Sequence, residues 1–490
     1  MSNQNRVYII GAGFAGRAIG KEIKEKGTFG EIVAFFDDDP EKIGSKCLDI
    51  PIHGPIDSMP SLVQPKANDE ALIAIPSAPH QQIRRIFELL RTTGFSNIRI
   101  LPTLSQIIDG NVHFIQTRQI NLQDLLNRTP VIINLKESLS YLRDKRVVIT
   151  GAGGSIGSEL SRQLLAAGAQ RLYLFGHGEN SIYEIERELR ILQDQGVGEK
   201  TTIVPVIGEL QDRDYMFFIL SRLKADIVFH AAAYKHVPLL ESNPVEAIKN
   251  NVFGTKNLVE AAHHAHIKRF VLISTDKAVD PSCVYGASKF IAEQLVLNNF
   301  SENQDFMVVR FGNVLGSRGS IIPLFQKQIC TGGPVTITHP QTSRFFMTIP
   351  EASSLVLKAA GVGTNNTVYL LDMGEPLSIK ELAEQMIRFY GYEPEEQIKI
   401  EYIGLRPGEK LTENLWSQNE HPIQTDVKKV LRLNRSKTNL IDIHAVLTEL
   451  RKVCYYHDDH KEYYRNRRKL RSILKTVVPT LLEKEDEPEF

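Results

Sequence analysis

Tyr285 and Lys289 carry the clearest chemical signal in the sequence. They lie one helical turn apart in the segment VYGASKF, so a helix would place both side chains on one face. A phenol has an unperturbed pKa of about 10 and is a weak base at neutral pH. A neighbouring ammonium group favours the phenolate, which can then remove a proton from a hydroxyl group. We therefore expect these two residues to be catalytic.

A second chemical group precedes this pair. Thr275, Asp276 and Lys277 follow one another in ISTDKAV, at the end of a strand of the buried type. The carboxyl ends of parallel strands are where such sheets bind ligands. An adjacent acid and amine can be a simple surface ion pair. In this position, however, they would supply a second acid and base, which a simple dehydrogenase does not need.

The segment TGAGGSIG, residues 150–157, predicts a dinucleotide site. Gly151, Gly154 and Gly157 follow the apolar strand RVVIT, and a helix beginning near Ser155 and Ile156 should cradle a pyrophosphate at its N-terminus. A positively charged nicotinamide there would also favour the phenolate. Gly176 and His177 stand where the next strand usually ends in an acid that binds ribose. The choice between NAD and NADP therefore stays open.

An earlier glycine turn has the same form. Gly11, Gly13 and Gly16 form GxGxxG directly after the strand RVYII, and Asp37 closes the following strand. No catalytic group accompanies them. We expect a regulatory or scaffolding domain, with or without a bound nucleotide.

The elements that must position these residues alternate between strands and helices. This alternation starts twice, which predicts an α/β fold with two doubly wound, Rossmann-like domains in tandem and a smaller substrate-binding part in the second. We expect an N-terminal domain at residues 1–128, a connector with an amphipathic helix at 129–145 and a catalytic domain at 146–420. Residues 421–490 should form a helical extension with a basic, solvated surface helix and an acidic tail.

Composition excludes several classes of protein. Among 490 residues, 58 Lys and Arg balance 58 Asp and Glu, which argues against a nucleic-acid or membrane-surface protein. No apolar run could span a membrane, and the start lacks a secretory signal. The four cysteines have no paired spacing, as in cytoplasmic proteins. The histidine clusters lack completing ligands, so we expect no metal site; they are His263, His264, His266, His457 and His460.

Eight ordered segments between residues 146 and 413 resemble one enzyme family. They are TGAGGSIGSEL, AAAYKHVPLLESNP, NNVFGTKNL, STDKAV, VYGASK, RFGNVLGSRGSIIPLF, SRFFMTIPEA and RPGEKL. Together they are similar to the UDP-N-acetylglucosamine 4,6-dehydratase branch of the extended short-chain dehydrogenase/reductase superfamily, which serves bacterial surface-glycan biosynthesis. The first domain resembles the extra Rossmann-like region of the long members. The resemblance implies a tightly bound NAD or NADP that each turnover regenerates, a UDP-sugar substrate and a homo-oligomer paired through the helices that carry YxxxK.

Two departures from the family pattern bear on these expectations. Long members typically begin with transmembrane helices, which this chain lacks, so it resembles a soluble, cytoplasmic form. Many long members also carry methionine where this sequence has Tyr285. The tyrosine and lysine machinery of the short members should therefore apply.

The resemblance also implies a role for each catalytic residue. Tyr285, aided by Lys289 and Thr275, would take the proton of the sugar's 4-hydroxyl as carbon 4 is oxidised. Lys277 would then act as the base at carbon 5, and a protonated Asp276 would expel the 6-hydroxyl as water. Lys277 must then be neutral and Asp276 protonated, although the unperturbed pKa values of lysine and aspartic acid are about 10.4 and 3.9. Burial shifts both pKa values in the needed direction, although the mutual attraction of the two groups opposes this shift, so we expect a closed, dry site.

Binding residues follow from the same segments. Ala231, Ala232 and Lys235 follow the strand that borders the cofactor, and His236 comes next; a loop packed for shape is the alternative for the last two. The resemblance implies that four further residues hold the substrate's nucleotide diphosphate: Asn313, Arg344, Arg406 and Glu409. Asn251 would steady the catalytic helix.

Two other functions stay open. A UDP-sugar 4-epimerase of the same fold would return the hydride to the other face of carbon 4 and would need neither Asp276 nor Lys277 for elimination. A non-catalytic nucleotide-sensing subunit would bind cofactor without turnover. The sequence leaves the UDP-sugar, the configuration at carbon 5, the role of the first domain and the number of subunits undecided.

Overall fold

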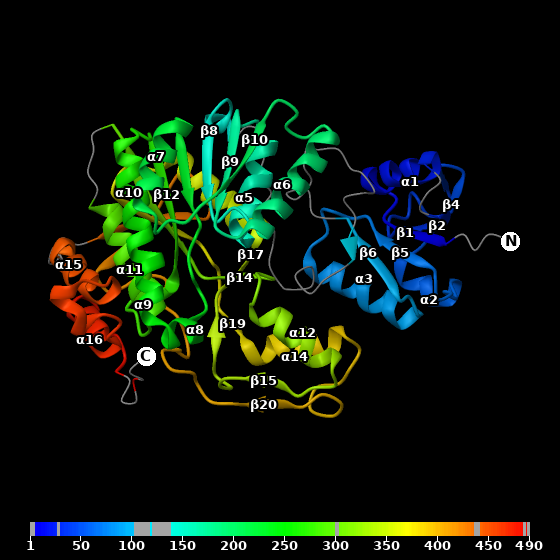
Figure 1. Cartoon of the computed structure of the whole chain (residues 1–490). Helices are drawn as coiled ribbons and strands as arrows, with labels where there is room; N and C mark the ends of the chain where they lie inside the picture. The colour runs from blue at the N-terminus through cyan, green and yellow to red at the C-terminus, as the bar shows by residue number, and fades with distance from the viewer. Residues whose placement is uncertain are drawn as a thin grey trace. The chain divides into compact units, whose positions relative to one another are not determined.

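The computed structural model describes residues 5–26, 30–101, 118–119, 139–298, 303–435, 442–483 and 487. The chain divides into two compact units, Met1–Asn134 and Leu135–Phe490 (Figure 1). The predicted connector lies outside the described residues up to position 138. Its described remainder holds the short 3-10 helix Ser140–Leu142, and the expected amphipathic helix falls mainly on residues outside the described part of the chain.

The first unit is a mostly parallel sheet in the order β3-β4-β2-β1-β5-β6-β7. Only the pairs β3–β4 and β6–β7 are antiparallel among the strands described there. The central strands β1, β2 and β5 are apolar and largely buried, as expected for a sheet with helices on its faces. The strands are β1 Arg6–Ile10, β2 Glu31–Phe36, β3 Lys46–Cys47, β4 Ile50–His53, β5 Glu70–Ile73, β6 Asn97–Ile100 and β7 Arg118–Gln119; the helices are α1 Phe14–Lys26, α2 Met59–Leu62 and α3 His80–Thr93.

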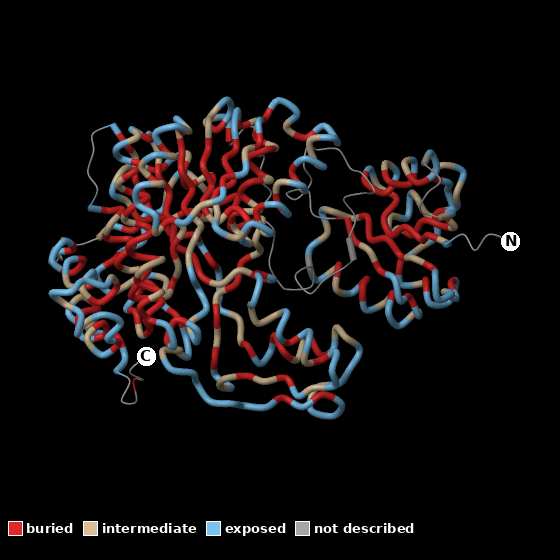
Figure 2. Tube along the Cα trace, in the orientation of Figure 1, coloured by how far each residue is buried: buried red, intermediate tan, exposed pale blue. Residues whose placement is uncertain are grey.

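The second unit is built on a larger sheet in the order β10-β9-β8-β11-β12-β13-β18-β22-β21. The first seven strands of this order are parallel, and β22 and β21 close the edge in antiparallel pairs. Figure 2 shows buried residues along these strands. The strands are β8 Arg146–Thr150, β9 Arg171–Gly176, β10 Thr202–Ile207, β11 Ile227–His230, β12 Arg269–Thr275, β13 Asp305–Phe311, β18 Thr367–Leu371, β21 Glu420–Gln424 and β22 Val430–Arg435.

Helices pack on both faces of this sheet. One group places α10 against α7 and α11, and another places α5 against α6 and α13. The strand order reverses between β8 and β11, so the loops after these strands diverge and leave a crevice for a ligand. The helices are α5 Ser155–Ala166, α6 Glu179–Asp194, α7 Arg213–Leu223, α8 Val237–Ser242, α9 Pro244–Ala247, the π-helix Ile248–Phe253, α10 Gly254–His264, α11 Val284–Leu297 and α13 Ile349–Val362. The predicted fold class is confirmed.

A smaller part adjoins the carboxyl edge of the sheet. It holds three two-stranded pairs, β14–β17, β15–β20 and β16–β19, with helices α12 and α14. It corresponds to the substrate-binding part that we expected. Its elements are β14 Asn313–Leu315, α12 Ile321–Cys330, β15 Val335–Ile337, β16 Ser343–Arg344, β17 Phe346–Thr348, β19 Leu377–Ser378, α14 Ile379–Phe389 and β20 Ile400–Tyr402.

The C-terminal residues belong to the catalytic unit more closely than the sequence suggested. The predicted boundary at 420/421 falls inside β21, because the main sheet continues to Arg435. Helices α15 Ile443–Cys454 and α16 Arg467–Val477 share a hydrophobic cluster with α9 and α11. The basic helix α16 therefore buries an apolar face and is not simply a solvated surface helix, because Leu470 and Leu474 are fully buried.

This packing bears on the expected homo-oligomer. Helix α11 carries Tyr285 and Lys289 and is buried along nearly its whole length, partly by α15. The expectation that copies of the chain pair through this helix is therefore not supported, because α8, α9, α10, the π-helix Ile248–Phe253 and α15 of the same chain pack on it. The homo-oligomer itself stays a prediction.

Candidate active site

A cavity of about 1160 Å³ lies in the second unit, where the carboxyl ends of the central strands meet the smaller part. It receives residues from the glycine turn before α5, from the loops after β11 and β12, from α11 and from the segment around residues 406–413. Most of the predicted site residues line it: Gly154, Ser155, Ile156, Gly157, Ala231, Lys235, His236, Thr275, Lys277, Tyr285, Lys289, Asn313, Arg344, Arg406 and Glu409. Gly151, His177, Ala232 and Asp276 lie outside its lining.

The glycine turn after β8 has the shape that a dinucleotide needs. A Cβ atom on Gly157 would lie 2.2 Å from the carbonyl oxygen of Gly151, so only glycine lets α5 approach the strand this closely. Gly151 has a φ of +67°, which favours glycine. The N-cap residue of α5, Gly154, has no side chain to cap it, so its first backbone N–H groups can meet an anion. These residues fit a pyrophosphate.

Tyr285 and Lys289 lie together on α11 and face the cavity. Burial raises the pKa of Tyr285 to about 12, although the nearby Lys277 charge opposes the shift. Burial also lowers the pKa of Lys289 to about 8, while Glu293 raises it. The Lys289 Nζ donates a hydrogen bond to the carbonyl oxygen of Ile273 at 2.8 Å. The phenol is therefore protonated at neutral pH.

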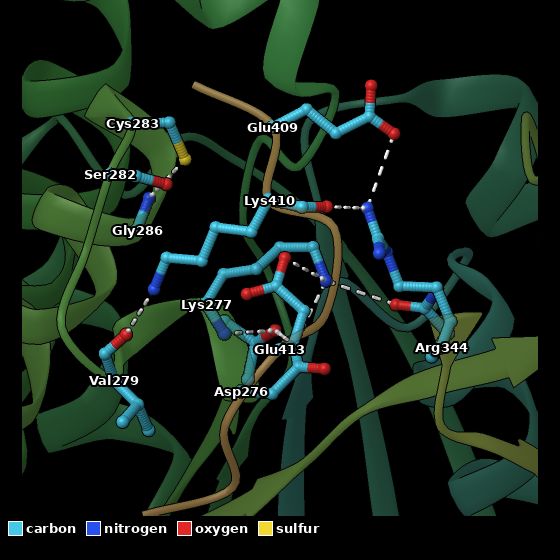
Figure 3. Close-up of polar contacts among 12 residues, drawn as sticks. Asp276, Lys277, Val279, Ser282, Cys283, Gly286, Arg344, Glu409, Lys410 and Glu413 are labelled. Carbon is cyan, nitrogen blue, oxygen red and sulfur yellow. Dashed lines mark hydrogen bonds and ion pairs between the residues drawn. The ribbon is translucent and has the colours of Figure 1, made fainter. Parts of the chain in front are cut away.

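Thr275 is the last residue of β12, and Asp276 and Lys277 follow it in a short 3-10 helix, at the strand end where the sequence predicted them. The Asp276 side chain is fully buried, and its Oδ1 atom accepts hydrogen bonds from the Thr275 hydroxyl at 2.9 Å and from the Lys277 Nζ at 3.0 Å. The Lys277 Nζ also donates to the Asn313 Oδ1 atom at 3.1 Å and lies 3.8 Å from Glu413. Figure 3 shows Lys277 between the carboxyl groups of Asp276 and Glu413.

The charge on Lys277 differs from the expectation. Burial favours the neutral amine, but the carboxylates of Asp276 and Glu413 outweigh burial and raise the pKa of Lys277. Burial alone therefore does not make this lysine neutral, because two acids share one amine and keep Lys277 an ammonium.

Arg344 and Glu409 hold a loop together. The Arg344 guanidinium donates to the carbonyl oxygens of Ser343, Leu411 and Lys410, each at 2.8 Å, and to the Glu409 Oε1 atom at 3.2 Å. Glu409 also accepts from the Arg406 backbone N–H. Their binding of substrate phosphate stays a prediction, and Arg344 already supports the loop that carries Arg406.

Lys235 and His236 follow β11 and reach the cavity from the other side. Burial lowers the pKa of both side chains, and the Lys235 Nζ lies 3.4 Å from the Ser317 hydroxyl. Asn251 is buried and bonds to the Ser288 hydroxyl of α11 at 3.0 Å. This contact agrees with the expected support of the catalytic helix. His177 is exposed beside the Tyr234 ring.

The glycine turn of the first unit resembles that of the second in form. Asp37 follows β2, and its carboxylate accepts a hydrogen bond from the Ala12 backbone N–H at 2.7 Å. Lys42 lies 3.5 Å from the same carboxylate. Asp37 thus stabilises its own turn, and a nucleotide site there stays a prediction. Within the described residues we find no cluster of metal-binding side chains and no helix that could span a membrane.

The sequence interpretation missed two residues at the cavity. Glu413 closely follows the RPGEKL segment, and its carboxylate neighbours Lys277. Arg318 donates to the Gly153 carbonyl oxygen at 3.2 Å and so connects the loop after β14 to the cofactor turn. Both residues lie within the stretch that carried the family resemblance. Only the folded chain shows which side chains they meet.

The comparisons with known proteins agree with this geometry. A family model described as "Polysaccharide biosynthesis protein" matches residues 147–435. The chain is 44% identical over 418 residues to the probable polysaccharide biosynthesis protein EpsC of Bacillus subtilis (strain 168), covering 85% of this chain and 69% of that one. The chain belongs to this family, and its predicted place in the extended short-chain dehydrogenase/reductase superfamily is confirmed.

More distant relatives carry more specific names. The chain is 31% identical to a UDP-N-acetylglucosamine 4,6-dehydratase (inverting) of Campylobacter jejuni, over 56% of this chain and 78% of that one. It is 33% identical to a UDP-glucose 4-epimerase of Rickettsia rickettsii, over 59% of this chain and 83% of that one. Among solved structures, Pen from Bacillus thuringiensis has a TM-score of 0.55 at 34% identity, over 61% of this chain and 91% of that one. The chain is thus an enzyme of the nucleotide-sugar dehydratase and epimerase group.

Proposed function

We propose that this member of the polysaccharide biosynthesis protein family is a UDP-N-acetylglucosamine 4,6-dehydratase, which forms the 4-keto-6-deoxy sugar nucleotide for bacterial surface-glycan biosynthesis. The observation that carries the proposal is the hydrogen bond between Asp276 and Lys277, because Lys277 lines the same cavity as Tyr285 and Asp276 lies directly behind it. An acid, a base and a phenol are the groups that oxidation and elimination on one sugar require. The Campylobacter jejuni relative supports the choice of sugar.

The glycine turn before α5 would hold NAD or NADP, with Gly154 and Gly157 beside the pyrophosphate. Bound there, the dinucleotide would accept a hydride from carbon 4 of the sugar and return one to carbon 6. Tyr285 would take the proton of the 4-hydroxyl, and the Lys289 charge would stabilise the phenolate. Thr275 lies in the same cavity and would orient the hydroxyl group.

The elimination of water would use Lys277 and Asp276. The ketone at carbon 4 acidifies the carbon 5 proton, which the neutral amine of Lys277 would remove. Asp276 would then protonate the 6-hydroxyl, which leaves as water. The Lys277–Asp276 ion pair already holds the one proton that the neutral amine and the protonated acid require, since moving it from Lys277 to Asp276 across 3.0 Å makes both groups neutral. A substrate that displaces water would favour that transfer, because a dry site disfavours separated charges.

Deuterated water gives the sharpest test. Purified protein with UDP-N-acetylglucosamine in D₂O should give a 4-keto-6-deoxy product with deuterium at carbon 5, measured by NMR. The Lys277→Met variant should oxidise carbon 4, trapped as deuterium at carbon 4 by borodeuteride, but release less ketosugar by a factor of about 100 or more. Unchanged substrate, together with inert related UDP-sugars, would refute the proposal. The coupling pattern at carbon 5 reports whether its configuration is retained or inverted.

A 4-epimerase is the second candidate, because the Rickettsia rickettsii relative carries that name. An epimerase would form UDP-N-acetylgalactosamine, release no water and leave carbon 5 without deuterium. The same NMR experiment separates the two activities. Asp276 and Lys277 favour the dehydratase, since epimerisation at carbon 4 gives neither residue a proton to transfer.

A further inference from the structure

Glu413 is a buried carboxyl group that the reaction described above does not use. Its side chain is 5% exposed and lines the cavity. The Oε1 atom lies 3.8 Å from the Lys277 Nζ, and the Oε2 atom is buried without a hydrogen-bond partner within the described part of the chain. A buried carboxylate without full hydrogen bonding is costly to keep. Its position beside a catalytic amine therefore calls for a functional explanation.

The Lys277 Nζ has neighbours in three directions. It donates to Asp276 Oδ1 at 3.0 Å and to Asn313 Oδ1 at 3.1 Å, and Glu413 lies on its remaining side. Asp276 and Asn313 hold the amine by hydrogen bonds, whereas Glu413 is beyond hydrogen-bond range. Glu413 can therefore act on Lys277 through its charge without fixing the amine in place (Figure 3).

We infer that Glu413 is a positioning residue whose carboxylate stabilises the positive charge that forms on Lys277 during elimination. This inference rests on the proposed dehydratase function. In that step the C5–H bond breaks and an N–H bond forms, so the amine becomes an ammonium. The electron pair enters the conjugated ketone and expels the 6-hydroxyl, which takes a proton from Asp276 and leaves as water.

Asp276 also becomes an anion in this step, but only when it gives its proton to the departing 6-hydroxyl. It therefore carries no negative charge before the carbon 5 proton moves, whereas Glu413 does. Glu413 has no proton to give to the sugar in this scheme, and its negative charge faces Lys277 throughout. A carboxylate behind a histidine base in hydrolases stabilises the cation in the same way. The arrangement lets carbon 5 meet a base whose charged form is favoured by the protein.

Several other groups act on this charge. The groups that face Lys277 or Glu413 from the neighbouring elements are Asp276, Arg344, Lys410, Tyr285 and Cys283. Burial opposes the ammonium form of Lys277, and Arg344 opposes it too. Glu413 offsets these effects. Burial in turn raises the pKa of Glu413, while Lys277 lowers it.

Two measurements on Glu413→Gln test the inference. The first needs no substrate: the rate at which an amine reagent labels Lys277, read by mass spectrometry, reports the neutral fraction of the amine. Loss of the carboxylate should lower the pKa of Lys277, which makes labelling about tenfold faster at a fixed pH. The second is catalysis, where kcat and the rate of deuterium entry at carbon 5 should fall by about 10- to 100-fold with KM little changed.

The combination is diagnostic, because the variant should have more neutral amine and yet a slower elimination. A mere loss of structure would not make Lys277 more reactive. Glu413→Asp keeps the charge and should recover part of kcat. Glu393→Gln removes a carboxyl on a distant loop, outside the lining of the cavity, and should match the wild type in both measurements.

The outcomes separate this inference from the proposed function. If wild-type protein dehydrates no UDP-sugar, the proposed function fails, and the labelling experiment still measures the coupling between Glu413 and Lys277. If the wild type is active and Glu413→Gln leaves either Lys277 labelling or kcat unchanged, the inference is wrong. Equal losses in Glu413→Asp and Glu413→Gln would also overturn it, because a role through charge requires partial rescue.

Discussion

Two residues of the cavity are held in protonation states opposite to those that the proposed reaction needs. Lys277 is an ammonium between two carboxylates, and burial raises the pKa of the Tyr285 phenol to about 12. Under the proposed function, a bound cation near Tyr285 and a substrate over Lys277 would change the local charge and solvation and so favour the reactive protonation states.

Lys289 gives the clearest dependence of stability on pH. Its folded pKa of about 8 lies below the unfolded value of about 10.4, so the unfolded chain binds more protons between these values. The free energy of unfolding should therefore rise with pH between these two pKa values. Below them, the folded protein bears the full cost of burying the charged Lys289. Relative to Lys289→Met, wild-type protein should gain about 2.5 kcal/mol of unfolding free energy from pH 8 to 10.4.

Urea unfolding of both proteins across this pH range measures that difference. Lys327→Met removes an exposed lysine and should show no such trend. A constant difference between wild type and Lys289→Met would mean that the lysine is not desolvated in the folded protein.

At the scale of elements, hydrogen bonds connect the C-terminal extension to the start of α11, which carries Tyr285. Glu241 of α8 accepts a hydrogen bond from the backbone N–H of Val284, at the start of α11, and another from Arg471 of α16, both at 2.7 Å. The Thr480 hydroxyl donates to the carbonyl oxygen of Pro281 at 2.9 Å. The extension therefore holds the segment that leads to Tyr285, in addition to covering α11.

Arg471→Met should remove the hydrogen bond that connects α16 to Glu241. Arg471 also pairs with Glu487, so its loss removes an ion-pair partner from two buried carboxylates. Removing one partner of a buried ion pair typically costs about 3–5 kcal/mol of unfolding free energy. Calorimetry should show a lower Tm, and Arg468→Met on the same helix should unfold like the wild type, because Arg468 is exposed. An unchanged Tm in Arg471→Met would show that the extension is not locked in this way.

At the scale of the whole molecule, the site belongs to one unit. Every residue that lines the cavity lies between positions 154 and 413, within the unit Leu135–Phe490. That unit has its own sheet and its own buried clusters. The first unit has a separate core around β1, β2 and β5. The described lining of the cavity therefore draws on the second unit alone.

A fragment of residues 135–490 should therefore fold and catalyse without the first unit. We expect its kcat to lie within about twofold of the full chain, because the chemistry is local to the cavity. Steady-state kinetics and circular dichroism check this. A folded fragment without activity would show that the first unit contributes to the site.

Much of the fold and part of the site could be predicted from the sequence. Short apolar runs and glycine turns predicted both sheets, because buried parallel strands and tight turns depend on local residue types. The boundary at 420 was wrong, since the edge strands β21 and β22 are polar enough to resemble a surface segment. Helix α16 was assigned to solvent because its many basic residues concealed the apolar face with Leu470 and Leu474.

The sequence by itself determined the chemical groups: the two glycine turns, the Tyr285 and Lys289 spacing and the adjacent acid and amine at the end of β12. These features are local, and backbone geometry alone places their members together. Only the tertiary structure decided what surrounds them. Glu413 reaches Lys277 from a distant segment of the chain, and the electrostatic field at a buried amine is the sum over all such neighbours, which spacing along the chain does not record.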